Sequence, residues 1–261
     1  MTEKHGGKAI VVKSRDEILI MQEANRIVAE TLVLLEKAVI PGISTWELDR
    51  IAEDFCRKKH AIPAFKGYRG FPGSLCVSVN EEVVHGIPSR RRKLKKGDIL
   101  SIDFGVCYKD YYGDSAITVA VDKISAAEEQ LLRVTEESLT RAIEKVVAGN
   151  RIADLSQAVQ AYVEGHGYSV VRQFVGHGIG KALHEGPEIP NFHQGEPTPR
   201  LIPGMVLAIE PMVNMGTYKV KVLRDGWTVV TADGKPSAHF EHSVAVTEDG
   251  PVVLSSRENV Q

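Results

Sequence analysis

The stretch LKKGDILSID, residues 94–103, determines how the chain can be interpreted, because a second version of it occurs further on. That version, LIPGMVLAIE at residues 201–210, begins 107 positions later, and GISTWEL at 42–48 returns as GNRIADL at 149–155 with the same separation. Two separate segments rarely share one offset by chance, and self-similarity of this kind indicates a repeated structural unit. We therefore expect a single domain over residues 1–261 with an internal duplication, its halves covering about 14–122 and 123–250.

Each half is expected to contain two helices followed by short strands. Ser14, Ser44 and Ser125 each stand three positions before a Glu, which is the capping-box pattern of a helix N-terminus, and a fourth helix is expected after Gly149. The expected strands are LCVSV from 75, DILSIDFGV from 98, SAITVAV from 115, SVV from 169 and VLAIEPMV from 206, with a hairpin through Asp225-Gly226. This order predicts an α+β fold in which helices cover one face of curved antiparallel sheets.

From the cysteine content and the hydropathy of the chain we expect a cytoplasmic protein that does not span a membrane. The three cysteines, Cys56, Cys76 and Cys107, form no CxxC pair, which is typical of reduced thiols. The N-terminal MTEKHGGKAIVV has no apolar core or cleavage site of a signal peptide, and no stretch approaches the roughly 20 apolar residues of a membrane span. We expect no membrane partner.

One stretch of the chain is strongly basic, although the net charge of the whole chain is −2. It consists of Arg90, Arg91, Arg92, Lys93, Lys95 and Lys96. Such a run is more often a solvated loop than a binding surface. A weak contact with RNA or the ribosome is the functional alternative.

Four carboxylates recur at matching places in the two halves. Asp103 ends the apolar run ILSI and Glu210 ends VLAI, while Asp114 and Glu241 each start a further strand. A lone Asp at a strand end is more often a local cap, but the duplicated pattern reverses that expectation for the set. Four converging carboxylates would repel one another strongly at low dielectric, and divalent cations would remove the repulsion. The pattern therefore predicts two metal ions.

A histidine between two glycines completes the predicted donor set. His177 stands in Gly176-His177-Gly178, where the backbone can approach a site closely. Imidazole with carboxylates suits Mn, Fe, Co or Zn better than Ca, without choosing among the four. The sequence motifs of other enzyme classes are missing. GHGIGK matches neither the phosphate-loop pattern nor the dinucleotide-binding pattern, and the chain has neither the HExxH motif nor the GxSxG motif of serine hydrolases.

At these residues the chain resembles the type I methionine aminopeptidases of the pita-bread metallopeptidase family, over nearly its whole length. The motifs that carry the resemblance are GYRGFPGSLCVSVNEEVVHGIP, GDILSIDFGVCYKDYYGDSA, VGHGIGKALHEGPEIPNF, PGMVLAIEPM, DGWTVVT and HFEHSVAVT. The resemblance implies removal of the N-terminal methionine from nascent proteins and peptides whose second residue is small. A hydroxide held between two metals would attack the peptide carbonyl, and the enzyme is expected to be a monomer.

The resemblance also implies a role for each site residue. Asp103 would bind one metal, His177 and Glu210 the other, and Asp114 and Glu241 would bridge them. Glu210 would also move protons between the water and the leaving amine. The remaining implied positions are His85 and His184 beside the substrate peptide, Tyr68, Phe71, Cys76 and Trp227 around the methionine side chain, and Asn80 and Ser237 near a monovalent cation.

Two departures and two alternatives accompany the resemblance. Phe71 stands where Tyr is common and Leu183 where Phe is common, so the pocket is expected to survive with a changed shape. Proline dipeptidases and aminopeptidase P share the same five ligands, but they usually carry a large N-terminal domain. A catalytically dead relative that binds RNA would be expected to lose ligands, and all five are present.

Overall fold

The helices begin where the sequence predicts. The computed structural model describes residues 9–195, 197–258 and 260, and within them Ser14, Ser44 and Ser125 complete the three expected capping boxes. They open α1 (Arg15–Ala38), α2 (Thr45–Lys58) and α3 (Ala126–Ile143). The fourth helix, α4 (Ile152–Gly165), follows Gly149 as expected. Residues 1–8, on which the signal-peptide expectation largely depends, lie outside the described residues.

The strands form one large curled sheet and two small ones, in all of which the paired strands are antiparallel. The large sheet runs β1-β4-β5-β14-β9-β7-β8, with β2 beside β4 and β15 beside β14. Its strands are β1 (Ile62–Pro63), β2 (Cys76–Val79), β4 (Ile99–Tyr108), β5 (Tyr111–Ala120), β7 (Gly176–Gly178), β8 (Glu185–Ile189), β9 (Val206–Ile209), β14 (Glu241–Thr247) and β15 (Gly250–Val253).

The small sheets run β13-β10-β6 and β11-β12-β3. They are built from β3 (Glu82–Val84), β6 (Ser169–Val170), β10 (Met212–Asn214), β11 (Val220–Val222), β12 (Val229–Thr231) and β13 (Ser237–His239). The pairing of β11 with β12 confirms the predicted hairpin through Asp225-Gly226. A one-turn 3₁₀ helix, η1 (Tyr68–Gly70), precedes β2.

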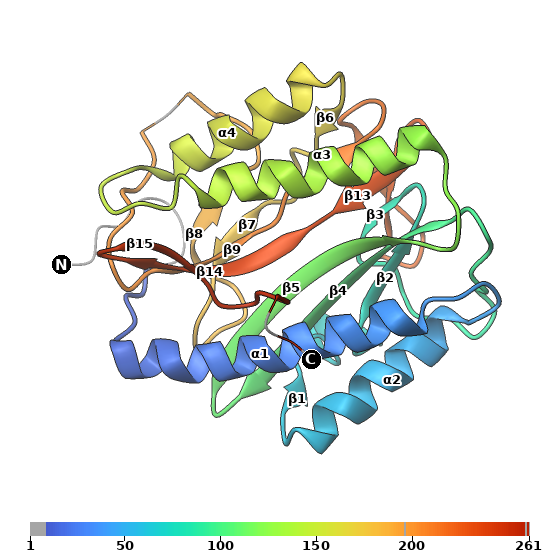
Figure 1. Ribbon diagram of the computed structural model, residues 1–261, viewed down its shortest axis with the longest axis horizontal. Helices are drawn as coiled ribbons and strands as arrows, with labels where there is room; N and C mark the ends of the chain where they lie inside the picture. Colours follow the sequence, from blue (N-terminus) through green and yellow to red (C-terminus); the bar gives the residue numbers. More distant parts are fainter. Residues whose placement is uncertain (1–8, 196, 259, 261) are drawn as a thin grey trace.

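The helix pairs pack on different parts of the strands. α1 packs along β4 and β5, whereas α3 and α4 pack against strands of the second half, including β6, β8, β9 and β13. Figure 1 shows α1 and α2 along one edge of the molecule, α3 and α4 along the other, and the long strands between them. This arrangement confirms the predicted α+β architecture. Among the described residues, no helix is both long and apolar enough to cross a membrane.

One strand start was predicted wrongly. The strand expected from 98 does run past Asp103, as β4 to Tyr108, but Asp114 does not start the next strand, because β5 begins at Tyr111. The two strands pair over their whole length, and the turn between them uses Lys109 and Asp110 at φ of 48° and 65°. Two consecutive residues with positive φ are typical of a tight hairpin, which lets both strands run past their carboxylates.

The strand order is symmetric about its central pair. β5 and β14 lie side by side, flanked by β4 and β9, which carry the two versions of the repeated stretch. The internal duplication stays a prediction, and the symmetric order is what such a duplication would produce.

Candidate metal centre and substrate pocket

Strand register places Asp114 and His177 on the same face of the curled sheet. Asp114 lies opposite Gly105, Ser243 donates to the Asp114 carbonyl at 2.8 Å, and Ala208 pairs with both Ser243 and His177. Neighbouring strands lie about 4.8 Å apart, so a flat sheet would separate the two ligand-bearing strands by roughly 14 Å. The curl and the small side chains between them allow the ligand atoms to meet.

A second row of paired residues carries two further carboxylates. Asp103 and Glu241 both pair with Ala116, from opposite sides of β5, and Cys76 pairs with Asp103 on its other side. Glu210 directly follows β9 and precedes Pro211. Cross-strand partners share a face of the sheet, so the register brings Asp103 and Glu241 to the concave face beside Asp114.

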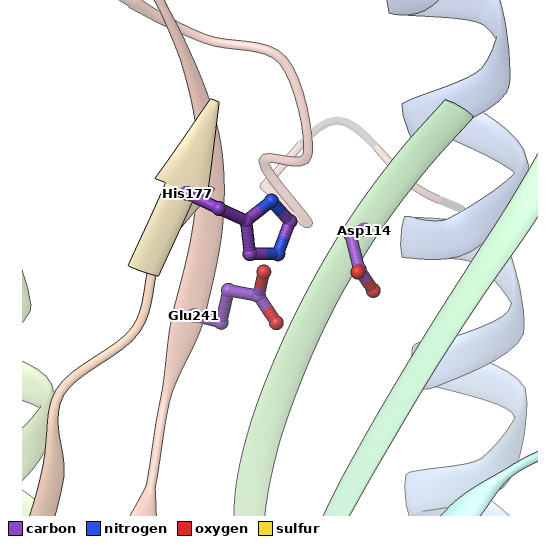
Figure 2. A group of neighbouring side chains, drawn as sticks. All are labelled: Asp114, His177 and Glu241. Atoms are coloured by element: carbon purple, nitrogen blue, oxygen red, sulfur yellow. The ribbon is translucent and has the colours of Figure 1, made fainter. Parts of the chain in front are cut away.

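The donors converge in the interior. Ligand atoms of Asp114, His177 and Glu241 all lie within 4.8 Å of one another, and all three residues are buried. Figure 2 shows their side chains pointing toward one another from β5, β7 and β14. Glu210 joins them, because its Oε1 lies 3.7 Å from Nε2 of His177.

The ring of His177 is oriented for ligation through Nε2. Its Nδ1 lies 2.9 Å from the carbonyl oxygen of Gly178, which can only accept a hydrogen bond, so Nδ1 carries the proton. A neutral imidazole then presents a lone pair on Nε2 toward the carboxylates. A backbone carbonyl that holds the distal nitrogen in this way is common for metal-binding histidines.

Burial raises the pKa of every carboxyl in the cluster. The pKa of Asp103 rises to about 7. Those of Asp114, Glu210 and Glu241 rise well above their usual values, through burial first and then through the neighbouring carboxylates. Ionising all four carboxyl groups together is therefore unfavourable, because they are buried close to one another.

The donor set fits divalent metal ions. Oδ1 of Asp103 and Oδ1 of Asp114 are inaccessible to water and have no hydrogen-bond partner among the described residues. Buried carboxylate oxygens need a compensating charge or donor, which coordination would supply. One imidazole among carboxylates suits first-row transition metals.

An unpredicted histidine lies beside the cluster. His239, at the end of β13, has Nε2 at 3.7 Å from Oε2 of Glu210. Burial lowers its pKa to about 3, with a smaller contribution from His85, so the ring is neutral near pH 7. Its place two residues before Glu241, in the motif HFEH, was the signal in the sequence that could have identified it.

The predicted pocket residues belong to one apolar cluster. Phe71 and Cys76 are buried in it together with Leu183, while Tyr68 and Trp227 pack against it. The rings of Phe71 and Trp227 meet edge to face at 5.2 Å. Since Cys76 pairs with Asp103, this apolar cluster adjoins the candidate metal centre.

The two histidines expected beside the substrate flank the same region. Nδ1 of His184 lies 2.9 Å from the Tyr68 hydroxyl, and its ring centroid lies 4.2 Å from that of His177. His85, at φ of 60°, faces Trp227 with ring centroids 6.2 Å apart, and burial lowers its pKa to about 4. The aromatic residues therefore connect both histidines to the pocket.

The side chains at the expected monovalent site are already bonded to protein groups. Asn80 donates to Asp98 and accepts from the Ile99 amide, while Ser237 donates to Asn214. The Asn80 carbonyl accepts from the Ser237 amide at 2.9 Å. The cation site stays a prediction, and an ion there would depend on backbone carbonyls.

The basic run has local partners. Arg90 lies 3.5 Å over the Trp46 ring, and Arg92, Lys93 and Lys96 each approach an acidic side chain within 4 Å. These contacts favour the solvated-loop interpretation, and the ribosome contact stays a prediction.

Comparisons with known proteins agree with this geometry. The profile of Metallopeptidase family M24 matches residues 20–248. The chain is 56% identical over 246 residues to methionine aminopeptidase 1 of Bacillus subtilis, which covers 94% of this chain and 99% of that protein. The crystal structure of methionine aminopeptidase from Thermotoga maritima superposes with a TM-score of 0.93 at 43% identity, covering 95% and 99% of the two chains.

A solved prolidase shows only the shared fold. The enzyme from Pyrococcus furiosus has a TM-score of 0.78 at 22% identity, and the match covers 95% of this chain but 66% of the prolidase. About a third of that prolidase therefore has no counterpart in the match.

Proposed function

This chain belongs to metallopeptidase family M24, and from its similarity to methionine aminopeptidases we propose that it is a methionine aminopeptidase, which removes the N-terminal methionine from peptides and nascent proteins. The observation that carries the proposal is the convergence of Asp114, His177 and Glu241 within 4.8 Å, beside an apolar cluster that contains Phe71 and Cys76. We expect the enzyme to act as a cytoplasmic monomer on substrates with a small second residue.

Five residues would hold two divalent ions at this centre. They are Asp103, Asp114, His177, Glu210 and Glu241. Divalent ions bound here would lower the pKa of water from about 15.7 to about 7 and polarise a peptide carbonyl. Co, Mn, Fe and Zn all match the donor set.

The surrounding side chains would orient the peptide and move its protons. Glu210 is 14% exposed and lies against His177, where its carboxylate could transfer a proton to the leaving amine. The hydroxyl of Tyr68 lies 2.9 Å from Nδ1 of His184 and would orient its ring beside the scissile peptide group. His85 would face the substrate from the opposite wall, beside Trp227.

The apolar cluster would bind the methionine side chain. A flexible thioether packs well against aromatic rings, with sulfur–aromatic contacts worth about 0.3–1.5 kcal/mol each. Leu183 and Phe71 complete the cluster without adding a polar group, so the pocket stays apolar despite both departures from the usual residues.

Trp227→Ala is expected to raise KM for a Met-Ala-Ser peptide about tenfold or more, because it removes one wall of this pocket. Steady-state kinetics would measure the change. The matched control is Trp46→Ala, since Trp46 contacts Arg90 and not the pocket cluster. Equal KM values for the two variants would show that Trp227 does not contact the methionine side chain of the substrate.

The substrate assignment is tested by comparing Met-Ala-Ser with Ala-Pro peptides. Methionine release from the first, with no turnover of the second, is expected from metal-loaded enzyme. Cleavage of only the proline peptides would instead assign the chain to the proline-specific branch of the family.

A further inference from the structure

Glu210 lies between two imidazoles, and its two carboxylate oxygens face different ones. Oε1 is 3.7 Å from Nε2 of His177, and Oε2 is 3.7 Å from Nε2 of His239. The proposed ligand set uses His177 and leaves His239 without a role. Its side chain is only 2% exposed, so water does not account for it.

Nε2 of His239 has no hydrogen-bond partner within residues 9–195, 197–258 and 260. Buried nitrogen atoms in folded proteins nearly always have a partner, and each exception needs an explanation. The nearby carboxylate oxygen of Glu210 is a strong acceptor that faces this nitrogen. Their separation is longer than a hydrogen bond, and a small rotation of the Glu210 side chain would close it.

The backbone of His239 is rigidly held, so only side-chain rotation separates the two groups. The His239 amide donates to the hydroxyl of Thr118 at 2.9 Å, and that hydroxyl donates to the His239 carbonyl at 2.8 Å. His239 also pairs with Met212 on β10, two residues after Glu210. The strand that follows Glu210 therefore fixes the backbone of His239 close to Glu210.

We propose that His239 is a positioning residue whose Nε2–H donates to Oε2 of Glu210 and so keeps Oε1 directed toward His177 and the ion that these two residues would hold. The inference depends on the proposed metal site. It assigns the two oxygens of Glu210 different tasks, one toward the ion and one toward His239. A hydrogen bond that orients a ligating carboxylate typically changes metal affinity about 10- to 100-fold.

Two substitutions separate the hydrogen bond from the volume of the ring. His239→Gln places an N–H donor near the position of Nε2, whereas the shorter side chain in His239→Asn reaches only as far as Nδ1. The matched control is His242→Asn, because His242 belongs to the same HFEH motif and is half-buried, but bonds through Nδ1 to Ser255 at 2.8 Å. All three variants would be prepared metal-free and titrated with Co²⁺ by calorimetry and visible absorption, with Tm measured in parallel.

His239→Asn is expected to weaken the affected Co²⁺ dissociation constant about 10- to 100-fold and to change the visible spectrum of the bound ion. His239→Gln should stay within about threefold of wild type, and His242→Asn should bind Co²⁺ like wild type even if its Tm falls. The proposal is overturned if His239→Asn binds Co²⁺ like wild type, if His239→Gln is as weak as His239→Asn, or if His242→Asn weakens binding equally. A wild-type protein that binds no Co²⁺ would instead overturn the proposed metal site itself.

Discussion

His177→Ala is expected to lower kcat/KM for Met-Ala-Ser by at least about a thousandfold, a loss at the upper end of that seen when one preorganised charge-stabilising group is removed. His177 is the imidazole of the proposed ligand set, and its Nδ1 contact with Gly178 aims Nε2 at Glu210 and the other carboxylates. Alanine removes a ligand without adding volume. The fold should persist, because the strand pairing of β7 uses backbone groups.

Steady-state kinetics in metal-replete buffer would measure this loss, with thermal unfolding as the test of folding. Asp103→Asn should behave in the same way, because it also removes one ligand. The control is His166→Ala, since His166 caps α4 and packs against Tyr162 with the two rings tilted. Near-wild-type turnover by the His177 or Asp103 variant would show that the residue is not an essential ligand.

Metal-loaded and metal-free protein are expected to differ in stability by an amount that grows as pH rises from 6 to 8.5. The pKa of Asp103 is raised to about 7, and those of Asp114, Glu210 and Glu241 are raised well above their usual values. A carboxyl whose folded-state pKa is raised stabilises the fold at low pH, and that stability is lost as pH rises through the folded pKa. In the metal-free protein the four groups therefore destabilise the fold progressively, whereas bound cations compensate their charge.

Other buried groups act equally on both forms and cancel in the difference. Burial lowers the pKa of His242 to about 3, so its contribution has the opposite sign and is complete above the pKa of an unfolded histidine. We expect the gap in Tm between Mn²⁺-loaded and chelated protein to widen by on the order of 5 °C across this range. Asp114→Asn removes one of the charges and should flatten the pH dependence of the chelated form. A gap that stays constant with pH would contradict the clustered, uncompensated carboxylates.

Helices and donor chemistry could be predicted because their signals are local. A capping box such as Ser14–Glu17 spans one helical turn, and each one predicted is present. The identities of the carboxylates followed from a repeat that is visible in the letters alone, whereas His177 followed from its place between two glycines and from the family resemblance. The start of β5 could not be predicted in the same way, because SAITVAV looks complete from Ser115 while the paired strand already begins at Tyr111.

By itself, the sequence determined which elements form, which side chains could bind metal, and which family the chain resembles. Only the tertiary structure decided which donors meet, because Asp114 and Glu241 are far apart in the chain and meet through the pairing of β5 with β14. It also revealed His239 beside Glu210, which depends on the position of β13 against β10. The alternation of side chains along a strand determines which face of the sheet each side chain lies on, but it does not determine which strand lies next to it. Only the pairing of strands that are distant in the chain determines those neighbours.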